Sequence, residues 1–165
     1  GGDGHREAVM PKLDIEAAPL RTGSIYPEPY ASMMRGRSSR RLGLAGGLTQ
    51  FGVNLVTLEP GAAASLRHAH EREDEFAWVV EGELVLVEDG GETVLRAGDC
   101  AAWPCGTGLH HHLVNRSGAP ARFLVVGTSS PDERATYAEH DFVVVREKGA
   151  TRFTHRDGTP WSGPR

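Results

Sequence analysis

Short apolar runs recur about every ten residues between positions 48 and 127, and turn-forming residues separate them. The separators include Pro60-Gly61, Gly90-Gly91 and Ser117-Gly118. Runs of this length and spacing predict β-strands that pack into a barrel or a sandwich. The sequence therefore indicates an all-β fold, with strands expected at residues 48–58, 65–70, 75–81, 83–88, 92–96, 100–103, 111–115 and 122–126.

The segments on either side of this core are less regular. Residues 17–20 and 133–139 could each form a turn or two of helix. Residues 14–41 carry three prolines, which favours an extended arm. Residues 142–146 predict one further strand, followed by a tail rich in glycine and proline.

These features divide the chain into three expected parts. Residues 1–9, which precede Met10, are interpreted as an upstream extension or a remnant of cloning. Arms on a small barrel either wrap that barrel or cross to a partner and cover an open sheet edge, and we favour a homodimer. The expected parts are an N-terminal extension and arm at 1–47, a barrel core at 48–127, and a C-terminal strand and tail at 128–165.

Length and charge narrow the function. A chain of 165 residues is ordinary for one domain, and its net charge of -4 argues against a nucleic-acid partner. No run approaches the roughly 18 consecutive apolar residues of a membrane helix, and no signal-peptide core is recognisable. We therefore expect a cytoplasmic protein with no membrane partner.

Two further groups of side chains are assigned to the surface. The histidines interpreted as surface residues are His5, His140 and His155. The basic residues interpreted as a solvated loop are Arg35, Arg37, Arg40 and Arg41.

The run His68-Ala69-His70 places two imidazoles on one face of a strand, because side chains alternate along a strand. Glu75 follows a polar turn and begins the next strand, so an antiparallel hairpin would bring its carboxylate near the histidine pair. His111 begins another strand. Three imidazoles and one carboxylate are therefore expected to converge in the hollow of the barrel.

A metal ion explains why such side chains would share a buried site. A buried carboxylate is costly unless it is paired, and buried histidines need partners for both ring nitrogens. A mixed nitrogen and oxygen set favours Fe, Mn, Ni, Zn or Cu over Ca and Mg. The alternative is that each histidine is structural. We expect one divalent transition metal, with positions open to a small-molecule ligand, bound by His68, His70, Glu75 and His111.

The same residues resemble the first motif of the cupin superfamily, G-x5-H-x-H-x3,4-E-x6-G. Here the gap between the first glycine and the first histidine is one residue longer than in the motif. The matching residues are Gly61, His68, His70, Glu75 and Gly82.

The second cupin motif, G-x5-P-x-G-x2-H-x3-N, has a looser counterpart in Gly98, Pro104, Gly106, His111 and Asn115. The gap before the histidine is four residues instead of two, and three histidines are consecutive there. Spacing back from Asn115 selects His111, whereas strand parity turns His110 and His112 to the other face.

The resemblance implies a double-stranded β-helix, that is, a jelly-roll cupin barrel with a metal near its centre and frequent dimers. The pattern is most similar to small single-domain bacterial cupins of the conserved-barrel or phosphomannose-isomerase-like type. Cupins include dioxygenases, decarboxylases, isomerases, epimerases and non-enzymatic sugar-binding or regulatory modules. The motifs therefore favour a fold and a metal and leave the reaction open.

We favour a metal-dependent enzyme, dioxygenase-like or isomerase-like, that acts on a small oxygen-rich or carboxylate-bearing metabolite. No second base is recognisable, because Glu81 and Glu83 flank a turn at Gly82. The alternatives are a non-catalytic module that binds a small molecule such as a sugar, and a metal that only stabilises the barrel. The residues expected to line a substrate pocket are Phe51, Val53 and Trp103.

Overall fold

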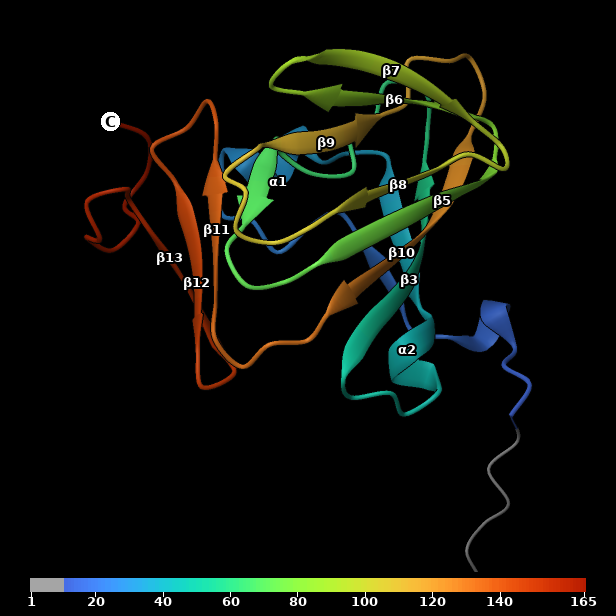
Figure 1. Ribbon diagram of the computed structural model, residues 1–165, viewed down its shortest axis with the longest axis horizontal. Helices are drawn as coiled ribbons and strands as arrows, with labels where there is room; N and C mark the ends of the chain where they lie inside the picture. Colours follow the sequence, from blue (N-terminus) through green and yellow to red (C-terminus); the bar gives the residue numbers. More distant parts are fainter. Residues whose placement is uncertain (1–10) are drawn as a thin grey trace, which may run out of the picture.

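The computed structural model describes residues 11–165, in which thirteen strands form two antiparallel sheets (Figure 1). Sheet A contains, in spatial order, β1 (Leu20–Thr22), β2 (Arg37–Arg41), β3 (Phe51–Leu58), β10 (Ala121–Thr128), β5 (Glu75–Glu81) and β8 (Cys100–Trp103). Sheet B contains, in spatial order, β13 (Ala150–Thr154), β12 (Val143–Glu147), β11 (Glu133–Tyr137), β4 (His68–His70), β9 (His111–Val114), β6 (Glu83–Glu88) and β7 (Gly91–Arg96). The helical elements are η1 (Ile15–Ala17), α1 (Tyr30–Met33) and α2 (Leu42–Ala45). None of these helices is long and apolar enough to cross a membrane.

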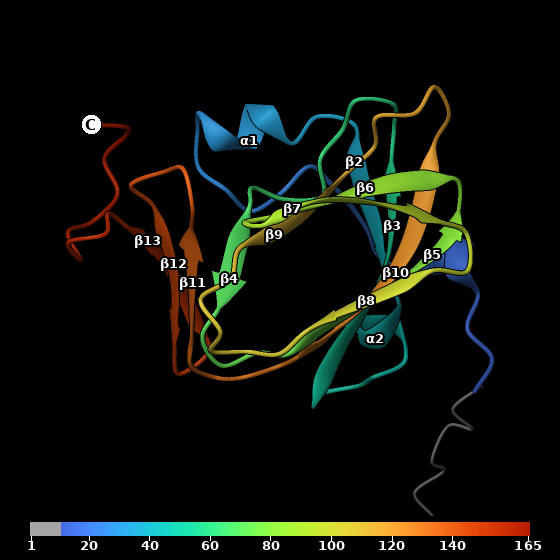
Figure 2. The same ribbon diagram turned by 45° about the horizontal axis from the view of Figure 1, so that its top comes forward.

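The two sheets face each other across the barrel (Figure 2). A hydrophobic core fills the space between them. Alternate side chains of the central strands point into it, as the period of two along a strand requires. Its fully buried members come from both sheets and include Val56, Leu58, Val79 and Leu84. The prediction of an all-β, jelly-roll barrel is confirmed.

The chain passes directly from sheet A to sheet B at Gly82, between β5 and β6. Gly82 has a φ of 80°, in the left-handed region that favours glycine. A Cβ atom at this position would lie only 2.9 Å from the carbonyl oxygen of Pro120. Both the backbone conformation and the close packing therefore require glycine at position 82, the last glycine of the first motif.

Most predicted strands are present with small shifts at their ends. Strand β4 is shorter than the predicted 65–70, because only His68–His70 pairs with β11. The predictions that match without a shift are 75–81, 83–88 and 100–103, which are β5, β6 and β8.

The prediction of helical turns at 133–139 is wrong, because Glu133–Tyr137 forms strand β11. Glu133, Ala135 and Tyr137 are buried while the residues between them are more exposed, which is the pattern of a strand. Pairing with β4 on one side and β12 on the other stabilises this conformation. Tertiary contacts therefore decide the structure of this polar segment.

The N-terminal arm adds two strands to the barrel instead of forming a separate extended segment. Strand β2 pairs with β3, and β1 pairs with β2, so the arm covers what would otherwise be an open edge of β3. The interpretation of the basic cluster as a solvated loop is wrong for Arg37, Arg40 and Arg41, which lie in β2.

A second hydrophobic cluster joins the arm to the C-terminal strands and tail. Tyr30 of α1, Tyr137 of β11 and the following Phe142 are buried in it, and Trp161 packs against them. The tail therefore packs on its own chain.

The surface assignment of His155 is wrong. This side chain is fully buried, its Nδ1 lies 3.0 Å from Oδ2 of Asp141, and its ring packs against that of Trp161. His140 is half-buried against the ring of Tyr30. His5 lies outside the described residues.

Asn115, the last residue of the second motif, provides a test of the fold. It is fully buried, its Nδ2 donates to the carbonyl oxygens of Leu58 (2.9 Å) and Ala119 (2.8 Å), and its Oδ1 accepts from the Ser117 amide. Because Asn115→Ala leaves buried carbonyl groups without a donor, we expect the free energy of unfolding to fall by about 2–4 kcal/mol. Chemical denaturation measures the change, and Thr93→Ala on the exposed surface should cost less than about 1 kcal/mol. Equal losses in the two variants would contradict the role assigned to Asn115.

Candidate metal centre

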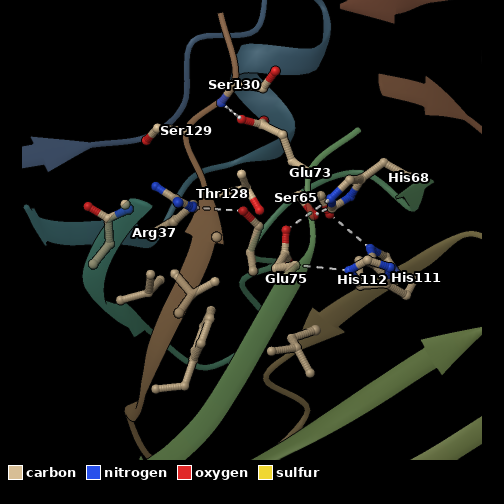
Figure 3. A pocket seen from close by; sticks show the side chains of 18 of the residues that line it. Arg37, Ser65, His68, Glu73, Glu75, His111, His112, Thr128, Ser129 and Ser130 are labelled. Carbon is tan, nitrogen blue, oxygen red and sulfur yellow. Dashed lines mark hydrogen bonds and ion pairs between the residues drawn. The ribbon is translucent and has the colours of Figure 1, made fainter. Parts of the chain in front are cut away.

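Two histidines of β4 and the first residue of β5 meet between the sheets. Nε2 of His68 lies 3.1 Å from Nε2 of His70, which lies 3.1 Å from Oε2 of Glu75. One ligand atom from each of these residues can be chosen so that all lie within 4.8 Å of one another. Figure 3 shows the Glu75 side chain between the strands, directed toward the histidines. The short strand β4 therefore presents both imidazoles to one carboxylate of the opposite sheet.

His111 joins this group from β9. It is the direct ladder partner of His68, and its Nε2 lies 3.2 Å from Oε1 of Glu75. The indole of Trp103 stacks on the His111 ring, with ring centroids 4.0 Å apart and planes within 5°. The structure thus brings the four predicted ligand residues together, and Trp103 packs against one of them.

Hydrogen bonds orient one of the imidazoles. Nδ1 of His68 donates to the carbonyl oxygen of Leu66 at 2.8 Å, which leaves the Nε2 lone pair directed at the group. Nδ1 of His70 and Nδ1 of His111 have no hydrogen-bond partner within residues 11–165. The contact of Nε2 with Glu75 and the stacking on Trp103 therefore orient the His111 ring.

The protonation of the group follows from its burial and contacts. Burial raises the pKa of the Glu75 carboxyl, but hydrogen bonds with His111, His68 and His70 outweigh it and hold that pKa well below its usual range. Burial lowers the pKa of His111. Burial also acts to lower the pKa of His70, but the contact with Glu75 reverses the effect and raises it. The group therefore combines an ionised carboxylate with imidazoles whose nitrogens face it.

This donor set suits a divalent transition metal. Three imidazole nitrogens and a carboxylate are the mixed ligands that such ions prefer, and the two facing Nε2 atoms of His68 and His70 would both have lone pairs to share with a cation. The chemistry of the donors, together with their convergence, therefore fits a metal held by Nε2 of the three histidines and the carboxylate of Glu75.

The neighbours of His111 make other contacts. Nδ1 of His112 donates to the carbonyl oxygen of Ser65 at 2.8 Å, and burial lowers the pKa of this imidazole. The backbone amide of His110 donates to Asp89, and Nε2 of the His110 ring lies 3.2 Å from Oγ1 of Thr136. Neither imidazole contacts Glu75 in the described structure.

A cavity of about 700 Å³ extends from the histidine group across the barrel (Figure 3). Its wall on β3 is formed by Gly52, Asn54 and Val56, so the residues predicted to line a substrate pocket, Phe51, Val53 and Trp103, are not part of the lining of this cavity. Phe51 and Val53 instead line a smaller hollow of about 230 Å³, which shares Arg37 and Asn54 with the main cavity. The residues of β3 that line the main cavity are one position out of step with the predicted ones, because Gly52 and Asn54 lie on the opposite face of the strand from Phe51 and Val53.

The sequence pattern does not identify two of the cavity residues, Glu73 and Arg37. Glu73 belongs to a polar turn in the sequence, where an exposed side chain is expected, yet it is only 8% exposed. Its Oε2 accepts hydrogen bonds from the Ser130 amide (2.8 Å) and from Nη1 of Arg146 (3.0 Å). The sequence predicts that Arg37 lies in a solvated loop, yet this residue lines the same cavity. Both depend on contacts between segments that are far apart in the chain, which no local pattern reveals.

Comparisons with known proteins identify the family. Residues 54–127 match the family model of the cupin domain. A solved structure described as a sugar phosphate isomerase of the cupin superfamily, from Silicibacter pomeroyi, is 54% identical with a TM-score of 0.89. The match covers 93% of this chain and 98% of that one. The chain belongs to the cupin superfamily.

More distant solved structures share the fold alone. A structure from Acidithiobacillus ferrooxidans is 24% identical with a TM-score of 0.69, and the match covers 77% of this chain and 81% of that one. A polyketide cyclase from Streptomyces resistomycificus is 23% identical with a TM-score of 0.62, with 80% and 89% of the chains covered. A search of curated proteins gives no match.

The consecutive histidines allow a matched test of the ligand set. We expect His111→Ala to lower the affinity for Mn²⁺ or Zn²⁺ by about tenfold or more, because it removes a nitrogen that faces Glu75. His112→Ala should leave that affinity unchanged, since its ring is bound to Ser65 instead. Titration calorimetry and metal analysis of the purified variants measure both effects. Full metal content in His111→Ala, or equal losses in the two variants, would refute the assignment.

Proposed function

We propose that this cupin is a metal-dependent isomerase of sugar phosphates. The observation that carries the proposal is the convergence of three imidazoles and the Glu75 carboxylate on one side of a cavity of about 700 Å³. A cavity of this size suits a small metabolite. The 54% identical relative described as a sugar phosphate isomerase supports the reaction class and favours it over dioxygenase-like chemistry.

An aldose–ketose isomerisation removes a proton from the carbon beside the carbonyl group, returns one to the carbonyl carbon, and moves a hydroxyl proton between the two oxygens. A bound divalent metal supplies polarisation of those oxygens. His68, His70, Glu75 and His111 would hold the ion. The reaction also needs a group that accepts and returns the carbon-bound proton.

Glu73 is suited to that proton transfer. Among the described residues that line the cavity, it supplies the carboxylate outside the proposed ligand set. The Ser130 amide and the Arg146 guanidinium hold its Oε2, while Oε1 has no hydrogen-bond partner in residues 11–165. One oxygen is thus fixed and the other is available to a substrate.

The proposal is tested by assaying aldose and ketose phosphates with the metal-loaded protein. We expect interconversion that is lost on chelation and restored by metal. Glu73→Gln should lower kcat by about 10²–10⁴-fold with unchanged metal content, because it removes the proton acceptor. The matched control is Glu71→Gln, an exposed carboxylate nearby, which should retain full activity. Ligand binding without interconversion would refute the isomerase and favour a non-catalytic module, and oxygen consumption would favour a dioxygenase.

We also propose a homodimer formed through the outer face of sheet A. Paired residues on this face are apolar, with Phe76 opposite Val126 and Trp78 opposite Leu124 in the ladder of β5 and β10. Phe76 is 38% exposed and Trp78 49% exposed. An apolar patch that spans neighbouring strands is typical of a protein interface.

Sedimentation velocity tests this interface. We expect the wild-type protein to be a dimer and Trp78→Glu to be a monomer with unchanged metal content, because a carboxylate in an apolar contact is costly. Leu109→Glu, at a position that is 63% exposed and outside sheet A, is the control and should remain dimeric. A monomeric wild-type protein, or a dimeric Trp78→Glu variant, would contradict this arrangement.

A further inference from the structure

Arg37 is a half-buried cation without a carboxylate partner among residues 11–165. Its Nε donates to the carbonyl oxygen of Ala64 at 2.7 Å, and its Nη1 donates to that of Gly23 at 3.0 Å. A guanidinium has five N–H donors, so these two bonds position the group and leave donors for another acceptor. The described side chains provide none.

The ladder of β2 and β3 sets the direction of this side chain. Arg37 pairs with Leu58, whose side chain is in the barrel core, and directly paired residues share a face. Arg37 therefore points to the inner side of the sheet, where it lines the cavity that His68, Glu75 and His111 also line. In Figure 3, Arg37 and Ser129 lie on one side of that cavity and the labelled histidines on the other.

Two more arginines share this face of the arm. Arg41 pairs with Asn54 on β3, and Arg21 of β1 pairs with Ser39, the residue between Arg37 and Arg41 on the inner face. All three arginines line a hollow of about 230 Å³ next to the main cavity. Like Arg37, the other two form no ion pair with a carboxylate of the described chain.

The two hollows share lining residues. Arg37, Asn54 and Ser129 line both of them. The side-chain amide of Asn54 and the hydroxyl of Ser129 make no hydrogen bond to the described part of the chain, so both can serve a ligand. One small molecule could therefore contact the histidine group at one end and the arginines at the other.

The electrostatics of this region favour an anion. Burial lowers the pKa of the Arg37 guanidinium; Tyr26 opposes this effect and the nearby charge of Arg21 adds to it. Three like charges brought together without a counter-ion repel one another, and desolvation of Arg37 adds to the cost. A bound dianion would offset both the repulsion among the arginines and the cost of desolvating Arg37.

We propose that Arg37, assisted by Arg21 and Arg41, binds the phosphate group of the substrate whose other end meets the histidine group. The assignment rests on the proposed function for the identity of that substrate. Guanidinium groups match the geometry of phosphate oxygens and bind them through paired, charge-assisted hydrogen bonds. Three cations suit a phosphate dianion better than a single carboxylate, so phosphorylated sugars should bind in preference to free sugars or sugar acids.

Titration calorimetry with inorganic phosphate tests this site directly, on both the metal-loaded and the chelator-treated protein. We expect phosphate to bind in both states, because the arginines do not depend on the metal. Arg37→Met should weaken phosphate binding by about tenfold or more, and Arg41→Met by severalfold, with unchanged metal content. The control is Arg40→Met, on the opposite face of the same strand, where the arginine pairs with Glu16; phosphate affinity should stay within about twofold.

Each remaining outcome is decisive. Because Arg37 also bonds to Ala64 and Gly23, thermal unfolding must show that Arg37→Met is folded, and Arg41→Met, which loses no such bond, is the second variant. Phosphate binding that disappears on chelation but survives both substitutions would make phosphate a metal ligand and overturn the site. No binding at about 10 mM phosphate, or equal effects of all three substitutions, would also overturn it. Arginine-dependent binding without sugar phosphate turnover would support this site and refute only the isomerase.

Discussion

The Glu75 carboxylate connects the two sheets of this barrel. It begins β5 in sheet A and contacts Nε2 of His70 and Nε2 of His111 in sheet B. A carboxylate among apolar side chains is stable only if it is compensated, and the compensation requires β4 and β9 to be neighbours with His68 opposite His111. A register shift of one residue would turn the imidazoles to the other face and leave the charge unpaired.

The central strands and the residues that converge on Glu75 could be predicted because their signals are local. The pair His68 and His70 depends only on alternation along a strand, and His111 could be selected by its spacing to Asn115. Which residues of β3 face the main cavity could not be predicted in this way. Phe51 and Val53 are more apolar than Gly52 and Asn54, which line the main cavity, so hydrophobicity alone favours the wrong face of the strand.

The other errors have a different cause, which is contact between distant segments. Strand β11 is polar in sequence and forms because β4 and β12 pair with it. His155 is buried because Asp141 and Trp161 meet it in the fold. Arg37 becomes a cavity residue only when the arm pairs with β3 and the carbonyl groups of Ala64 and Gly23 position its guanidinium. The arm thus completes the cavity of a barrel whose own motifs supply only the histidine group.

The central claim is that one metal ion binds among His68, His70, Glu75 and His111. Anomalous X-ray diffraction from crystals of the Mn²⁺-loaded protein, collected near the manganese absorption edge, tests it most directly. The account predicts a single strong anomalous peak in contact with Nε2 of the three histidines and with the Glu75 carboxylate. A peak bound elsewhere, or density at this position that lacks His111 or Glu75 as a ligand, would contradict it.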